Sequence, residues 1–165
     1  MKYKIKEEHS VYKGILTVKK ATITHDRFQE NTAPITCTRE MLDRGGCVGV
    51  LLYEKDTDNL IMVNQFRYPT IAHTNGWLLE IVAGGIENNE DPKKSAIREI
   101  REETGYDIMD LEFIATFYTT PGNSSERMFL YYAAVTQEDR VYNGGGVAHE
   151  LEDIKVCQFK SHEID

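Results

Sequence analysis

The sequence predicts an α/β protein in which one sharply bounded helix lies among many short strands. The helix begins at Asp91-Pro92, because aspartate is a favoured N-cap and proline fits the first helical position. It ends at Gly105, since glycine readily takes the left-handed conformation that often follows a helix. Apolar and β-branched runs on both sides of this helix have the length and composition of strands.

The strand pattern divides the chain into two parts. We expect residues 1–42 to form a small N-terminal antiparallel β unit with strands at 3–6, 14–24 and 34–40. Three short strands bury little apolar surface, so this unit should pack against another surface. The main domain, residues 43–165, opens with an apolar run at 47–53 that predicts a buried strand. Its other expected strands are 60–65, 77–83, 111–118, 128–135 and 154–159.

A long segment, residues 136–153, separates the last two expected strands. It contains Gly144-Gly145-Gly146 and ends in several acidic residues. Long loops inside a compact domain are usually functional. The glycines fit either a hinge that moves this loop over a ligand or a simple flexible turn.

The helix carries three glutamates on one side. Residues three and four apart are neighbours on a helix, so Glu99, Glu102 and Glu103 project together beside an apolar face of Ala96, Ile97 and Ile100. Such like-charge pairs cost about 0.2–0.5 kcal/mol each, which calls for a positive partner. A divalent cation suits oxygen ligands and Arg98 is another candidate, although a solvated acidic face fits the spacing too. The basic residues Lys94, Arg98 and Arg101 should point the other way.

The composition limits the class of function. Asp and Glu number 27 against 19 Lys and Arg, a formal net charge of −8, which disfavours non-specific binding to nucleic acid or anionic membranes. Three widely spaced cysteines (Cys37, Cys47 and Cys157) fit a reducing compartment. With no signal peptide or long apolar run in the sequence, we expect a cytoplasmic protein without nucleic-acid or membrane partners.

The stretch GGIENNEDPKKSAIREIREETGY, residues 84–106, carries a longer pattern. Gly84, Glu90 and Arg98 are separated by five and seven residues, and Glu99, Glu102, Glu103 and Gly105 follow in fixed spacing. This stretch resembles the Nudix box at every defined position. The resemblance implies an α/β/α sandwich with a mixed sheet, in which the box forms a loop–helix–loop that holds catalytic Mg²⁺ or Mn²⁺. It also implies a pyrophosphatase that cleaves a nucleoside diphosphate from another group.

Segments outside the box resemble the ADP-ribose and nucleoside diphosphate sugar pyrophosphatase branch of that family. Pro121 lies 16 residues after Gly105, and QFRYP, WLLEIVAGGIE and TPGNSSE occur at residues 65–69, 77–87 and 120–126. LDRGG at 42–46 and GGGV at 144–147 look most like the GDP-mannose and UDP-sugar hydrolases. The leading hypothesis is hydrolysis of ADP-ribose or a nucleotide sugar to a nucleoside monophosphate and a sugar phosphate.

The resemblance also implies roles for individual residues. Glu99 and Glu103 match metal-binding glutamates, Glu102 assists them, and the carbonyl of Ala83 matches a further ligand. In the acidic end of the segment 136–153, called the acidic loop below, Glu150 is assigned as general base and Glu152 as metal ligand, with the reverse order left open. Substrate contacts are implied for Arg67, Glu80, Thr120 and Glu126.

Two further residues are proposed from their own chemistry. Gly85 follows Gly84, and paired glycines let the backbone approach metals and phosphates closely. Trp77, the only tryptophan, either belongs to the core or stacks on the base or sugar of the substrate.

A homodimer is expected, because the N-terminal unit needs a partner surface and the resembling branch pairs such a sheet with a second subunit. Two alternatives differ from the leading hypothesis. One is the same chemistry on a dinucleoside polyphosphate or coenzyme A. The other is a non-catalytic Nudix domain that senses a nucleotide, which the intact set of box glutamates disfavours.

Overall fold

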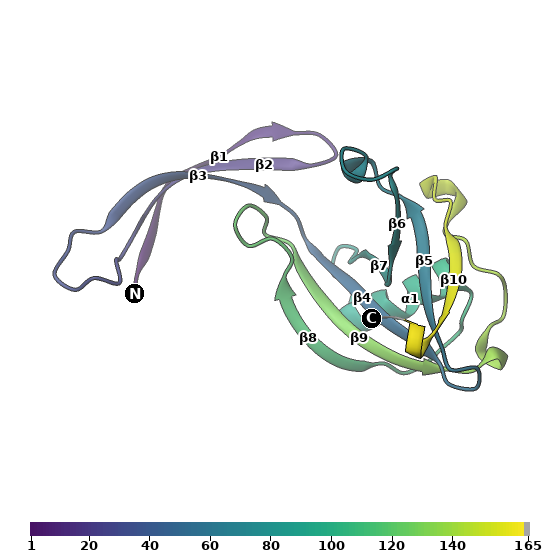
Figure 1. Ribbon diagram of the computed structural model, residues 1–165. Helices are drawn as coiled ribbons and strands as arrows, with labels where there is room; N and C mark the ends of the chain where they lie inside the picture. The colour runs from purple at the N-terminus through teal and green to yellow at the C-terminus, as the bar shows by residue number, and fades with distance from the viewer. Residues whose placement is uncertain (164–165) are drawn as a thin grey trace. The chain divides into compact units, whose positions relative to one another are not determined.

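The computed structural model describes residues 1–163 (Figure 1). The chain divides into two compact units. Unit 1 comprises residues 1–45 and 118–127, and unit 2 comprises residues 46–117 and the chain from residue 128 onward. The sequence-based boundaries, 1–42 and 43–165, differ from this division mainly in the segment 118–127, which groups with the N-terminal strands in unit 1.

Unit 1 is a three-stranded antiparallel sheet in the order β1-β2-β3. Its strands are β1 (Tyr3–Lys13), β2 (Thr17–His25) and β3 (Ile35–Asp43). The strand expected at 3–6 is too short, because β1 continues to Lys13 with register shifts along its pairing with β2. The alternation of apolar and polar residues at 3–6 does not continue through residues 7–10, and all of β1 is exposed, so pairing with β2 extends the strand.

Unit 2 is built on a sheet whose central strands run in the order β10-β5-β4-β9-β8. Two short strands lie off this path, with β6 paired to β5 and β7 paired to β4. The bounds are β4 (Gly46–Glu54), β5 (Asn59–Phe66), β6 (Trp77–Glu80), β7 (Val82–Gly85), β8 (Glu112–Tyr118), β9 (Arg127–Val135) and β10 (Lys155–Lys160).

The strand expected at 77–83 is wrong as a single element. It breaks at Ile81, where the chain leaves its pairing with β5 and begins to pair with β4. Val82 then lies opposite Val50, and Gly85 lies opposite Cys47. The change of partner places the first glycines of the box, Gly84 and Gly85, beside β4 in the last strand before the helix.

The helix α1 (Pro92–Thr104) has the ends that the sequence predicts. The Asp91 side chain accepts hydrogen bonds from the backbone N–H groups of Lys93 and Lys94, and Gly105 has a left-handed φ of 81°. Among residues 1–163, α1 is the one α-helix, and short 3₁₀ turns make up the other helical segments. The α/β class is therefore confirmed, with the strands greatly outnumbering the helix.

The core of unit 2 lies between α1 and the central strands. Ala96 and Ile100 are fully buried, as the helical pattern predicts, and Ile97 is partly buried against them. The other apolar side chains with no exposed surface come from β4, β5, β7 and the residue after Gly105; they are Val48, Val50, Leu52, Ile61, Val63, Val82 and Tyr106. This packing fixes the sheet-facing side of α1 and so positions its glutamates.

Candidate active site

Two glutamates of α1 are buried beside the glycines that end β7. The exposed fractions of Glu99 and Glu103 are 8% and 1%. The Ala83 N–H donates to Glu103 Oε2 at 3.3 Å. The Glu99 carboxylate occupies the space beside Gly84, since a Cβ placed on Gly84 would lie 2.0 Å from Glu99 Cδ. Gly84 therefore serves close approach between strand and helix.

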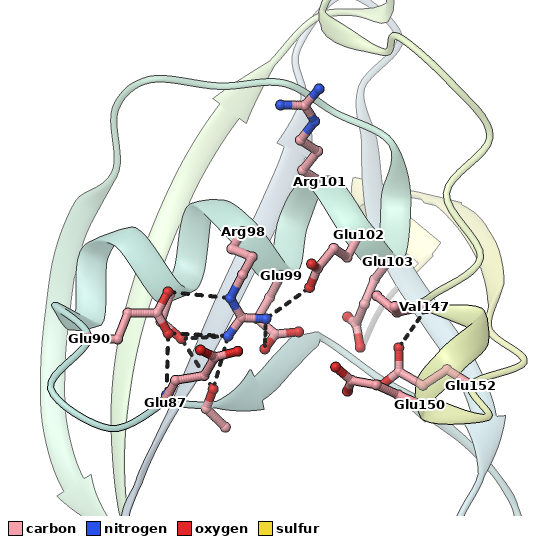
Figure 2. A network of polar contacts seen from close by, with 12 residues as sticks. Glu87, Glu90, Arg98, Glu99, Arg101, Glu102, Glu103, Val147, Glu150 and Glu152 are labelled. Carbon is pink, nitrogen blue, oxygen red and sulfur yellow. Dashed lines mark hydrogen bonds and ion pairs between the residues drawn. The ribbon is translucent and has the colours of Figure 1, made fainter.

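Arg98 holds the outer side of this carboxylate cluster. Its Nη1 lies 2.9 Å from Glu99 Oε1 and 2.8 Å from Glu102 Oε2, and its Nε and Nη2 reach Glu90 at 3.3 Å (Figure 2). The expectation that Arg98 points away from the glutamates is wrong, whereas the alternative that Arg98 is their positive partner is confirmed. A long arginine side chain can fold back, and its planar fork can bind several carboxylates at once.

The charge of Arg98 does not balance the whole cluster. Burial raises the pKa of Glu99 to about 7, against the opposing effect of Arg98. Burial raises the pKa of Glu103 to about 8, and repulsion from Glu99 and Glu152 adds to the rise. Both shifts have the cause expected for carboxylates removed from water with too little positive charge nearby. This arrangement of carboxyl groups can receive a cation or hold protons.

The acidic loop supplies two more carboxylates. Its 3₁₀ turn η3 (Ala148–Glu150) presents Glu150 at the surface, where its Oε1 lies 3.7 Å from His149 Nε2. Glu152 is held more firmly, because its Oε2 accepts the Val147 N–H at 2.9 Å. Figure 2 shows Glu150 and Glu152 reaching from this loop toward Glu103. The sequence-predicted carboxylates of the helix and of the loop thus come together.

A cavity of about 420 Å³ adjoins the acidic loop. Arg67 and Trp77 line it, as do Glu150 and Glu152. Arg67 Nε donates to Glu80 Oε2 at 2.8 Å, which fixes the guanidinium beside the opening. Trp77 is 47% exposed, so the interpretation that it belongs to the core is wrong.

Sequence reasoning missed several residues of this cavity, namely Gln65, Phe66, Leu151 and Asp153. Phe66 lies opposite Trp77 in the β5–β6 register, and the two rings meet edge to face with centroids 5.8 Å apart. Only the register of two strands brings these rings together. The QFRYP and WLLEIVAGGIE segments contain both residues, but their pairing is not visible in the sequence.

Three other sequence-predicted residues have different surroundings. The Gly85 carbonyl accepts hydrogen bonds from Arg98 Nη2 at 3.2 Å and from Ser95 Oγ at 3.3 Å. Thr120 and Glu126 belong to unit 1. There the Thr120 carbonyl closes a turn, and Glu126 pairs with Arg44 at 2.9 Å. Their substrate roles stay predictions.

Preformed metal geometry is absent from the part of the chain that the structure describes, since no three His, Cys, Asp or Glu side chains there are arranged to hold one ion. The hydrogen bonds explain this arrangement. Arg98 draws Glu99 and Glu102 to one side, while backbone N–H groups hold Glu103 and Glu152 separately. Residues 1–163 also contain no helix long and apolar enough to cross a membrane.

Comparisons with known proteins identify the fold and the family. The NUDIX domain model matches residues 43–164. The chain is 33% identical over 160 residues to an ADP-ribose pyrophosphatase of Haemophilus influenzae, covering 94% of this chain and 73% of that protein. The chain belongs to the Nudix family. The resemblance found in the sequence is thereby confirmed.

Other relatives of this Nudix protein carry a different name. The chain is 36% identical over 139 residues to a GDP-mannose pyrophosphatase of Salmonella arizonae, and the match covers 83% of this chain and 71% of the relative. A crystal structure of an ADP compounds hydrolase superposes with a TM-score of 0.73 at 20% identity, over 97% of this chain and 79% of that one. That likeness confirms the Nudix fold predicted from the sequence.

The raised pKa values predict how the stability of the metal-free Nudix protein depends on pH. A carboxyl group with a raised pKa in the folded state stabilises the protein below its unfolded value, and this contribution is lost as pH rises through the folded value. The free energy of unfolding in EDTA should therefore fall between about pH 4.5 and about pH 8 as Glu99 and Glu103 ionise.

Denaturant unfolding at several pH values measures this slope. Glu103→Gln should flatten it, whereas Glu112→Gln, on the exposed strand β8, should leave it unchanged. Equal slopes for the wild type and Glu103→Gln would contradict the electrostatic account of the cluster.

Proposed function

We propose that this Nudix protein hydrolyses the diphosphate bond of ADP-ribose or of a nucleoside diphosphate sugar, releasing a nucleoside monophosphate and a sugar phosphate. The observation that carries the proposal is the buried, undercompensated cluster of Glu99 and Glu103, facing Glu152 of the acidic loop. The names of the two groups of relatives support the substrate class. The cavity beside the cluster supports it too, because it offers an arginine and exposed aromatic rings to a nucleotide.

The donor set of the cluster fits a hard divalent cation. Glu99, Glu103 and Glu152 would hold Mg²⁺ or Mn²⁺, with help from Glu102 and the Ala83 carbonyl, because all these donors are oxygens. The pKa values of Glu99 and Glu103, raised by burial and mutual repulsion, favour a cation at this place. Such a cation neutralises charge on phosphoryl oxygens and lowers the pKa of water.

The acidic loop supplies the base. Glu150 is exposed and bound only weakly, so it can accept a proton from the water that attacks a phosphorus atom. The water oxygen bonds to phosphorus as the bond from that phosphorus to the bridging oxygen breaks. The bridging oxygen leaves with the departing phosphate and keeps the electron pair of the broken bond. Glu152 is tied to the Val147 N–H, and this fixed position suits a ligand better than a mobile base.

The substrate would lie in the adjoining cavity. Arg67 presents a fork-shaped donor that suits a diphosphate, and its bond to Glu80 keeps the guanidinium oriented. Trp77 and Phe66 expose ring surface on which a base or sugar can pack. Gly85, Thr120 and Glu126 are proposed as further substrate contacts on the basis of the sequence alone, and a cytoplasmic location rests on the sequence in the same way.

Hydrolysis of a nucleotide panel tests the proposed function. ADP-ribose, GDP-mannose and UDP-glucose should yield a nucleoside monophosphate with Mg²⁺ and give no product in EDTA. Glu103→Gln should lower kcat by about 10²-fold or more, since it removes a carboxylate from the charge-stabilising cluster. The variant should remain folded by circular dichroism. Cleavage of only dinucleoside polyphosphates or coenzyme A, or a wild-type rate in Glu103→Gln, would overturn the proposal.

Gly84→Ala tests the close approach of strand and helix. Its Cβ would displace the Glu99 carboxylate, which is the end of a flexible side chain, so function should suffer more than stability. We expect a 10–100-fold loss of Mn²⁺ affinity, typical for changes beside metal ligands, with a nearly unchanged unfolding midpoint. Gly45→Ala is the matched control, because nothing lies within 4 Å of its Cβ. Unchanged Mn²⁺ binding in Gly84→Ala, measured by calorimetry, would contradict this role.

A homodimer is also proposed, with unit 1 as its contact surface. The sheet of unit 1 carries an apolar groove of about 290 Å³, and exposed apolar residues such as Tyr3 and Ile5 line it. A second copy of the same sheet would cover that groove. Sedimentation equilibrium should give twice the chain mass for the wild type and the chain mass for Ile5→Asp. A monomeric wild type at micromolar concentration would exclude the dimer.

A further inference from the structure

The glycines at 144–146 are bound to the end of α1. The last carbonyls of a helix lack partners within it and need donors from elsewhere. Gly146 N–H donates to the Glu102 carbonyl at 3.0 Å, and Gly145 N–H donates to the Glu103 carbonyl at 2.9 Å. Two glycines of this segment are therefore hydrogen-bonded to the last turn of α1.

Neighbouring residues complete this cap. Arg140 Nε donates to the Thr104 carbonyl at 3.3 Å, Val141 N–H donates to the Gly105 carbonyl at 2.9 Å, and the Tyr142 hydroxyl donates to the Arg101 carbonyl. Each carbonyl from residue 101 to residue 105 thus receives a donor from the segment 140–146. The end of the helix and the start of the acidic loop form one hydrogen-bonded structure.

The same glycines close the base of the acidic loop. The Gly145 carbonyl accepts the Ile154 N–H at 3.1 Å, so residues on both sides of the loop are joined across its neck. Gly145 thereby connects the carbonyl of Glu103 with the residue that precedes β10. These hydrogen bonds consequently hold the loop that carries Glu152 at a fixed position beside the helical turn that carries Glu102 and Glu103.

Gly146 lies directly against Glu152. It has a φ of 84°, and a Cβ placed on it would lie 2.7 Å from Glu152 Cβ and 2.8 Å from Glu152 Oε2. The first of these atoms is the base of the side chain and cannot swing away. Glu152 Oε2 is also the atom that accepts the Val147 N–H, as Figure 2 shows. Any side chain at position 146 would therefore displace the carboxylate from its bond.

We infer that Gly146 is a positioning residue that reserves the space of Glu152 and so fixes this carboxylate opposite Glu103. The inference rests on the proposed function, because Glu152 is taken there as a metal ligand. Gly145 offers a matched contrast. It too has a positive φ, 116°, but a Cβ on it would meet nothing closer than the Ile154 carbonyl at 3.8 Å. Alanine at 145 strains the backbone without displacing Glu152, whereas alanine at 146 does both.

Hydrogen exchange of the Val147 amide, measured by NMR on the metal-free protein in EDTA, tests the positioning by itself. Gly146→Ala should speed this exchange at least tenfold, as should Glu152→Ala, since each removes the acceptor from the amide. Gly145→Ala should leave it near the wild-type rate. Gly146→Asn relieves backbone strain, because asparagine tolerates the left-handed region, but keeps the displacing Cβ and should also exchange fast. A wild-type rate in Gly146→Ala and Gly146→Asn would overturn the inference.

Binding of Mn²⁺ alone, followed by calorimetry, tests whether this position serves the metal. Gly146→Ala should weaken binding about 10–100-fold, and Gly145→Ala by much less. Combined with Glu152→Ala, Gly146→Ala should add no further loss, because the two changes remove the same ligand. Full additivity, or equal losses in the two glycine variants, would overturn the role in metal binding. A wild type that binds no Mn²⁺ yet keeps the exchange pattern would overturn the proposed function and leave the positioning intact.

Discussion

The burial of two like-charged carboxylates on one helix is the constraint around which unit 2 is arranged. Glu99 and Glu103 lie where water would normally solvate them, and their raised pKa values report the cost. Two neighbouring features reduce that cost, namely the fork of Arg98 and the Ala83 N–H, while Gly84 leaves room for the Glu99 carboxylate. The compensation is partial, and a partly compensated acidic cluster is the electrostatic condition that a cation-binding site requires.

How much of this arrangement a sequence can predict depends on the range of the interactions. The ends of α1 depend on contacts within a few residues, so Asp91 and Gly105 were predictable from capping chemistry. Strands such as β4 were predictable because their apolar runs are continuous. The length of β1 was not, because its exposed polar residues form a strand only through pairing with β2. The break at Ile81 likewise depends on two partner strands at once.

The site shows the same division. The family pattern points to the glutamates of the helix and loop, but not to the hydrogen bonds and ion pairs that hold them. The fold of Arg98 back toward Glu99 depends on its rotamer and on Glu90, eight residues earlier. The meeting of Phe66 and Trp77 depends on strand register. The cap that residues 140–146 form on α1 joins parts of the chain that lie about forty residues apart and share no local signal.

In the proposed function, chemistry and specificity occupy different places in this fold, which agrees with the similar identity of the chain to relatives with different names. The identity is 33% to an ADP-ribose pyrophosphatase and 36% to a GDP-mannose pyrophosphatase. The diphosphate chemistry would depend on the carboxylate cluster, which the box encodes in one continuous stretch. Recognition of the base and sugar would depend on cavity residues such as Phe66, Trp77 and Leu151, which come from separate segments. Glu152 lines the cavity and also acts electrostatically on Glu99 and Glu103, so the acidic loop is where the two requirements meet. A substrate that alters the position of this loop would alter the cluster as well, and selectivity could then be expressed in the rate of hydrolysis as well as in binding.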